Sequence, residues 1–194
     1  VDPDLICLAK ILAGGLPGGA VAGKQAIMNY LEFRDPHWNR YQKVAHQGTF
    51  NANPLSAVAG IAILEEIAKG EVTEEANRLC RLLVDELNDV LQEQGIEGCV
   101  YAEGSMFHIA LDLPCSSNRR GNCNYKCDTA DYVKLTELAK GVEVNTLRKV
   151  LLLEGIDLMR SGGFLSCTHT EEDIKKTREA FGIAIDILKS LNRR

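Results

Sequence analysis

The chain opens with a lysine that lies between a short apolar run and a glycine-rich loop. Lys10 follows the segment from Leu5 to Ala9, and Gly14 and Gly15 come soon after it. Glycine has no Cβ atom, so the backbone here can approach a ligand closely. Burial among the apolar neighbours would favour the neutral amine of the lysine, the form that attacks a carbonyl carbon. The pattern predicts a strand that ends at Lys10, and it leaves open whether this lysine is reactive or simply solvated.

A second informative stretch, residues 46–54, reads His-Gln-Gly-Thr-Phe-Asn-Ala-Asn-Pro. Asn53 is suited to cap a helix and Pro54 to occupy its first position, so we expect a helix that continues to a stop at Gly70. Gly48 and Thr49 precede this helix and offer backbone N–H groups and a hydroxyl to an anion such as a phosphate. An ordinary capped loop has the same spacing, so both interpretations stand at this point.

Residues 18–24 also match the beginning of a P-loop, the phosphate cradle of many nucleotide-binding proteins. The residue after Lys24 is Gln25, which cannot replace the Ser or Thr hydroxyl that binds magnesium in a P-loop. Pro17 and the glycines upstream also disrupt the strand that should come before such a loop. We therefore do not expect nucleotide binding.

The motif Lys10-x-x-Ala13-Gly14-Gly15-Leu16-Pro17, the run from Gly19 to Lys24 and the stretch 46–54 together resemble the class III (ω-type) aminotransferases. Within that family the chain is most similar to glutamate-1-semialdehyde aminomutases and to the β-amino-acid transaminases. The resemblance implies that Lys10 binds the cofactor pyridoxal 5'-phosphate as a Schiff base. It also implies that Gly48 and Thr49 hold the cofactor phosphate, with Thr49 reaching the site of the other subunit of a homodimer.

The same resemblance implies an α/β fold, the C-terminal part of the pyridoxal-phosphate-dependent transferase fold type I. Residues 1–72 would be the end of the large cofactor-binding domain, and residues 73–194 would form the small α+β domain. The chain would be the C-terminal portion of an enzyme. We expect it to fold at least in part and to be inactive alone.

The spacing of apolar residues predicts the elements of the remaining chain. We expect an amphipathic helix over 73–95, a half-buried strand over 105–112, helices over 129–140 and 144–154, short strands over 156–159 and 164–166, and a last helix after Thr170. Residues 20–22 are expected as a buried strand, 24–31 as a helix and 34–39 as a loop. His108 is expected on the surface of its strand, because no partner acid or nucleophile lies near it in the sequence.

Arg160 lies beside Ser161 and two glycines, between the two short strands. Its planar guanidinium could bind a substrate carboxylate, whereas a solvated loop arginine is the simpler alternative. The segment from Gly155 to Phe164 is shorter than in the aminomutases, and Ser161 or Gly162 replaces a glutamate that they have near its end. This difference favours transamination between an amino donor and a keto acid or aldehyde over the intramolecular aminomutase reaction. A non-catalytic dimerisation or scaffold fragment is the alternative outside enzymology.

Composition excludes several other functions. The net charge of −5 without a basic run argues against binding to nucleic acid or anionic membranes. No segment approaches the ~18 apolar residues of a transmembrane helix, and there is no signal-peptide pattern, so we expect a soluble, cytoplasmic protein. Cys115, Cys123 and Cys127 cluster within the loop 114–128, but their spacing fits no zinc pattern. We expect reduced thiols and no metal.

Overall fold

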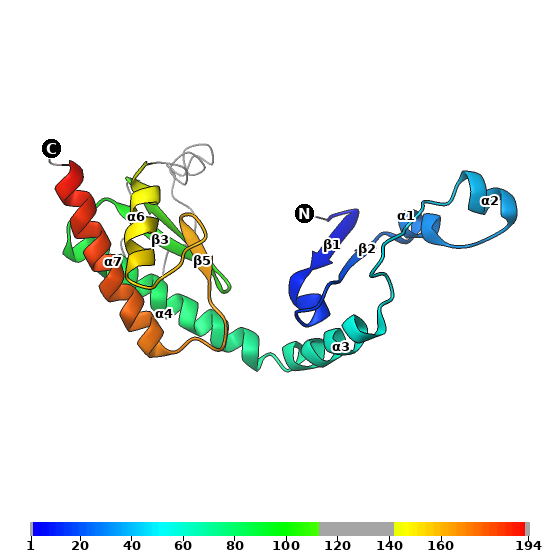
Figure 1. The fold of residues 1–194 in the computed structure, drawn as a ribbon, viewed down its shortest axis with the longest axis horizontal. Coiled ribbons are helices and arrows are strands. Elements are labelled where there is room, and N and C mark those ends of the chain that lie inside the picture. Colours follow the sequence, from blue (N-terminus) through cyan, green and yellow to red (C-terminus); the bar gives the residue numbers. More distant parts are fainter. Residues whose placement is uncertain (1, 113–141, 193–194) are drawn as a thin grey trace. The chain divides into compact units, whose positions relative to one another are not determined.

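Residues 2–112 and 142–192 are described by the computed structural model. They divide into two units, Val1–Gly70 and Glu71–Arg194, each with its own elements (Figure 1). The predicted helix over 129–140 and the cysteine loop over 114–128 lie outside the described residues. The assignment of residues 1–72 and 73–194 to two functional domains stays a prediction.

The first unit begins with an antiparallel hairpin. Strands β1 (Leu5–Ala9) and β2 (Gly19–Gly23) pair from Leu5 opposite Gly23 to Ala9 opposite Gly19. The connection between them contains a short 3-10 helix, η1 (Lys10–Ala13). The later elements of this unit are α1 (Gln25–Met28), η2 (Asn29–Leu31), α2 (Pro36–Tyr41) and α3 (Pro54–Ala68).

Helix α3 lies in backbone contact with η1. A Cβ atom added to Gly60 would lie 2.6 Å from the carbonyl oxygen of Leu12, and one added to Gly14 would lie 2.5 Å from that of Ala59. Both glycines therefore permit an approach that a larger residue would block. Gly60 and Ala13 are the only buried residues among the described part of this unit.

Most apolar side chains of the first unit are exposed. β1 and β2 are exposed along their whole length, and Leu55 and Val58 on α3 are each about two-thirds exposed. The expectation of a buried strand at residues 20–22 was therefore right about the strand and wrong about its burial, because no described element covers this hairpin. An apolar surface of this extent indicates an interaction surface.

The second unit has a continuous core. α4 (Glu71–Glu93) buries the predicted stripe, and α6 (Val142–Leu153) and α7 (Glu171–Asn192) confirm two further predicted helices. α7 packs against both α4 and α6 (Figure 1). A three-stranded antiparallel sheet of order β3-β4-β5 completes the unit: β3 (Gly98–Glu103), β4 (Met106–Leu111) and β5 (Gly162–Phe164). Phe107, Ile109 and Leu111 face the core, as their alternation predicted.

Two local predictions were wrong, and one strand was missed. Residues 36–41 form the helix α2 because Asp35 caps it, accepting hydrogen bonds from the backbone N–H groups of His37 and Trp38 at 2.9 and 3.0 Å. Strand β3 was not expected at all. Only residues 162–164 form a strand in the region where two were expected, although Met159 makes an isolated bridge to Gly162.

Candidate functional site

Lys10 lies at the junction of β1 and η1. Its backbone has φ 56°, in the left-handed region that residues with a Cβ atom seldom adopt. Its side chain is exposed, and among the described residues its ammonium group makes no hydrogen bond or ion pair. Backbone strain of this kind costs about 1–3 kcal/mol and clusters at functional sites. An unpaired lysine in a strained turn is therefore a candidate for binding a ligand.

Lys24, the other lysine of the hairpin, has a structural role. Its Nζ lies 2.8 Å from Oδ1 of Asp4 and 3.6 Å from a carboxylate oxygen of Asp2, so it closes the open end of the hairpin. Residues 19–23 form strand β2, whereas a P-loop would need an open turn there that leads into a helix. The structure thus agrees with the exclusion of a P-loop.

The apolar surroundings expected for Lys10 do not form within the described residues. Leu8 is 45% exposed and Ile11 is 59% exposed, so neither shields the amine from water. These side chains are exposed because no described element covers the apolar residues of the hairpin.

The loop that carries Gly48 and Thr49 is a tight turn. The backbone N–H of Asn51 donates to the carbonyl of Gly48 at 3.0 Å, and a Cβ atom added to Gly48 would lie 2.7 Å from Oδ1 of Asn51. Ala52 has φ 55°, also in the left-handed region. The side chain of Asn51 thus packs over Gly48, and Thr49 lies inside the turn that the Gly48–Asn51 hydrogen bond closes.

Asn53 caps α3 as predicted. Its Oδ1 accepts hydrogen bonds from the N–H groups of Leu55 at 2.9 Å and Ser56 at 3.3 Å. These groups are therefore not available to an anion. The donors that remain in this loop include the N–H groups of Thr49 and Phe50 and the hydroxyl of Thr49, which donate to no described group. An anion here would be held by the turn rather than by the start of the helix.

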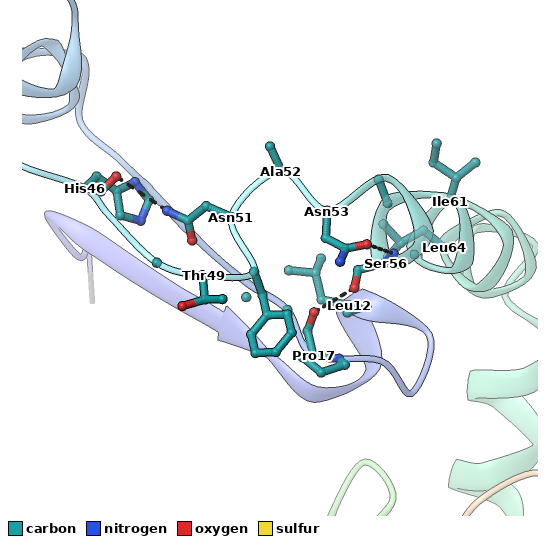
Figure 2. A pocket seen from close by; sticks show the side chains of 17 residues that line it. Leu12, Pro17, His46, Thr49, Asn51, Ala52, Asn53, Ser56, Ile61 and Leu64 are labelled. Atoms are coloured by element: carbon teal, nitrogen blue, oxygen red, sulfur yellow. Dashed lines mark hydrogen bonds between the residues drawn. The ribbon is translucent and has the colours of Figure 1, made fainter.

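A cavity of about 730 Å³ lies between this loop and the turn of the hairpin (Figure 2). Thr49 lines it from the loop and Pro17 from the hairpin turn, and Phe50 is also among the lining residues. Oγ of Ser56 donates a hydrogen bond of 2.8 Å to the carbonyl of Pro17 and so joins α3 to the hairpin turn. Leu12 and Ala13 of η1 also line the cavity.

The structure brings Gly48 and Thr49 to this cavity but not Lys10, which is absent from the residues that line it. Within one chain, the predicted phosphate-binding residues and the predicted Schiff-base lysine therefore do not share a cavity. This arrangement is compatible with Thr49 serving the site of a second subunit, as the resemblance implies.

Arg160 belongs to the second unit and also has a left-handed backbone, with φ 59°. Its side chain is exposed and makes no hydrogen bond or ion pair with the described residues. Beside it, Ser161 is 2% exposed, and its Oγ lies 2.6 Å from Nε2 of His108. His108 is half-buried rather than on an open surface, and this burial lowers the pKa of its imidazole.

Two contacts of these regions were not predicted from the sequence. Ser56 and Pro17 are 39 positions apart, and Ser161 and His108 are 53 apart, so no local pattern relates the partners.

No group of three or more metal-ligating side chains occurs in residues 2–112 and 142–192. Cys7, Cys80, Cys99 and Cys167 form no disulfide within the described residues, whereas Cys115, Cys123 and Cys127 lie outside them. None of the described helices is long and apolar enough to cross a membrane.

The residues present fit pyridoxal 5'-phosphate in their chemistry. This cofactor has an aldehyde, which an unpaired amine can bind, and a phosphate, which N–H and hydroxyl donors can bind. Lys10 offers the amine, and the Gly48–Thr49 turn offers the donors beside the cavity that both residues line.

Comparison with known proteins gives a consistent result. Residues 1–152 match the family model of class III aminotransferases. Over 97% of its length, the chain is 34% identical to a glutamate-1-semialdehyde 2,1-aminomutase from Methanopyrus kandleri, and over 98% it is 31% identical to one from Wigglesworthia glossinidia brevipalpis. It spans 40% of the length of each of these relatives.

Among solved structures, the chain is similar to an omega-transaminase from Sphaerobacter thermophilus. The two superpose with a TM-score of 0.74 and 27% identity, over 95% of this chain and 38% of that one. The predicted α/β class is confirmed by this similarity.

Proposed function

Since the chain belongs to the class III aminotransferases, a family that uses pyridoxal phosphate, we propose that it is part of an enzyme that transfers an amino group. The donor would be an amino-acid-like compound and the acceptor a keto acid or aldehyde. The observation that carries this proposal is the unpaired Lys10 in a strained turn, within the region that matches the family. A non-catalytic scaffold would have no need to keep this lysine and the Gly48–Thr49 turn together.

Lys10 is assigned two tasks. Its Nζ would hold the cofactor through the aldehyde, and as a free amine it would accept and return a proton. When bound, the cofactor supplies an electron sink for the charge that develops on the substrate carbon. The left-handed backbone at Lys10 restricts the directions its side chain can take, which favours the fixed orientation that both tasks need.

Gly48 and Thr49 are assigned to the cofactor phosphate. The hydroxyl of Thr49 and the N–H groups of Thr49 and Phe50 are free to donate, and both residues line the cavity. Because Lys10 does not line the cavity beside Thr49, we assign this turn to the site of the partner subunit in a homodimer. Arg160, exposed and unpaired, is assigned to the carboxylate of the substrate.

A glutamate-1-semialdehyde 2,1-aminomutase is the second candidate. Its support is that two relatives at 34% and 31% identity carry this name. Transamination is supported instead by the short segment around Arg160 and by the similarity to an omega-transaminase. We keep transamination first because the aminomutases have a glutamate where this chain has Ser161 or Gly162.

The assay that separates the two reactions asks whether turnover needs an added keto acid. A transaminase converts an amino donor only when an acceptor such as pyruvate is present, whereas an aminomutase converts glutamate-1-semialdehyde without one. We expect turnover to depend on the keto acid. Full activity on glutamate-1-semialdehyde with no external acceptor would reverse this order.

A further inference from the structure

Ser161 joins the turn that carries Arg160 to strand β4 through two hydrogen-bonded contacts. The side-chain Oγ of Ser161 lies 2.6 Å from Nε2 of His108, and its carbonyl accepts a hydrogen bond of 2.6 Å from the N–H of Ile109. Ser161 is also the one buried polar side chain among the described residues. Two consecutive residues of β4 thus bond the hydroxyl and the carbonyl of the residue next to Arg160.

The turn has little freedom to shift toward the sheet. A Cβ atom added to Gly162 would lie 2.2 Å from the carbonyl oxygen of Phe107, and one added to Gly163 would lie 2.9 Å from the Phe107 ring. On its other side, the N–H of Leu165 donates to the carbonyl of Ser105 at 2.9 Å. The strained backbone of Arg160 therefore persists because the contacts on its C-terminal side over-determine it.

His108 makes its contact with Ser161 as a neutral group. Its Nδ1 is buried and has no hydrogen-bond partner, so a second ring proton would be left unsatisfied. Burial accordingly lowers the pKa of His108. The ring of Tyr101 lies beside it, with centroids 5.2 Å apart. Either tautomer of the neutral imidazole can bond a hydroxyl, since a hydroxyl both donates and accepts.

We propose that His108 and Ser161 are positioning residues for Arg160, which hold its backbone in the left-handed conformation and so fix the direction of its guanidinium. Arg160 itself has no described partner, so its orientation depends on its backbone rather than on a bond at its tip. This inference rests on the proposed function in one respect, the assignment of Arg160 to a substrate carboxylate.

The first test uses the 194-residue chain and four variants: S161A, H108Q, H108N and R160A. The amide nitrogen of Gln reaches the position of Nε2, whereas that of Asn reaches only the position of Nδ1. H108Q should therefore keep the bond to Ser161, and H108N should lose it. The readouts are amide exchange at Ile109 and the φ angle of Arg160, both measured by NMR.

We expect amide exchange at Ile109 to rise about five-fold in S161A and H108N, the factor for losing one hydrogen bond, and to stay unchanged in H108Q and R160A. The φ angle of Arg160 should leave the left-handed region in the same two variants. The internal control is the N–H of Val100, which donates to Asn88 at 2.8 Å in the same sheet and should not change. Equal effects of H108Q and H108N, or an unchanged φ in S161A, would overturn the positioning role.

The second test is kinetic and uses the active protein that contains this chain. R160A, S161A and H108N should raise KM for a donor with a carboxylate and leave KM unchanged for an amine without one, whereas H108Q should resemble the unmodified protein. If R160A has this effect but S161A and H108N do not, the positioning role is wrong and the proposed function stands. If R160A has no effect, the assignment of Arg160 to the carboxylate is wrong, and the φ measurement alone decides whether His108 and Ser161 fix the turn.

Discussion

Ser56 on α3 donates a hydrogen bond of 2.8 Å to the carbonyl of Pro17, in the loop that follows Lys10. With the close approach of Gly60 to Leu12, this bond fixes α3 against the hairpin turn. The contact also forms part of the wall of the cavity beside Thr49, because both Ser56 and Pro17 line it. The position of η1, which begins at Lys10, therefore depends on α3.

The first prediction concerns Gly60. In Gly60→Ala, the new Cβ would lie 2.6 Å from the Leu12 carbonyl, so η1 must move away from α3. We expect weaker cofactor binding, measured by the absorbance of the bound cofactor in the active protein. The matched control is Gly182→Ala on α7, where the nearest atom lies at 3.8 Å and binding should not change. Equal binding in the two variants would show that the contact between η1 and α3 does not matter to the site.

The second prediction concerns the start of α7. Oγ of Thr170 accepts a hydrogen bond from the N–H of Asp173 at 3.2 Å, while Oδ2 of Asp173 accepts one from the N–H of Thr170 at 2.8 Å. Thr170→Ala should lower the free energy of unfolding of the second unit by about 1 kcal/mol, as for other helix caps. Urea denaturation measures this, with the exposed Thr168→Ala as control. A loss no larger than in the control would contradict the capping role.

The third prediction is a pH dependence. Burial lowers the pKa of His108 below its ordinary value of 6.5. Between the two values the unfolded chain binds more protons than the folded one, so stability falls as the pH drops through this interval. The stability that the neutral imidazole contributes is fully present above pH 6.5. Its loss is complete once the pH falls below the pKa of His108 in the folded chain. The unmodified chain should lose more stability than H108Q between pH 7 and pH 5, and parallel curves would exclude His108 as the cause.

Sequence patterns predicted the second unit better than the first. The stripe from Ala76 to Leu91 on α4 and the inward residues of β4 follow from helical and strand periodicity, and both were confirmed. Strand β3 was missed because Gly98 to Glu103 has no clear alternation and pairs with β4 through contacts that only the fold creates. The burial predicted for residues 20–22 in the first unit was wrong, because periodicity indicates which side chains are apolar and not whether another element covers them.

The sequence likewise predicted some features of the candidate site and missed others. Lys10, Gly48 and Thr49 lie in motifs that sequence alone reveals, and the cap at Asn53 follows from local rules. The bond between Ser56 and Pro17 and the contact between Ser161 and His108 join distant segments, so periodicity and motifs cannot indicate them. The left-handed backbone at Arg160 has no sequence signal either, since such positions usually carry glycine.

The fourth prediction concerns the chain alone. It spans 40% of the length of its relatives, and its hairpin and α3 leave large apolar side chains exposed. By resemblance, the ring that stacks on the cofactor and the carboxylate that pairs with its nitrogen come from segments upstream of the lysine. We expect the 194-residue chain to fold in its second unit and to show no turnover with pyridoxal phosphate and an amino donor. Micromolar cofactor binding together with turnover would contradict this.

The most direct test of the central claim asks which lysine holds the cofactor. In the active protein that contains this chain, pyridoxal phosphate should produce a visible absorption band, and borohydride reduction followed by peptide mass mapping should place the cofactor on Lys10. Lys10→Ala should abolish both signals, while Lys24→Ala, which only breaks the ion pairs with Asp2 and Asp4, should keep them. A band that survives unchanged in Lys10→Ala, or a label on another lysine, would contradict the assignment.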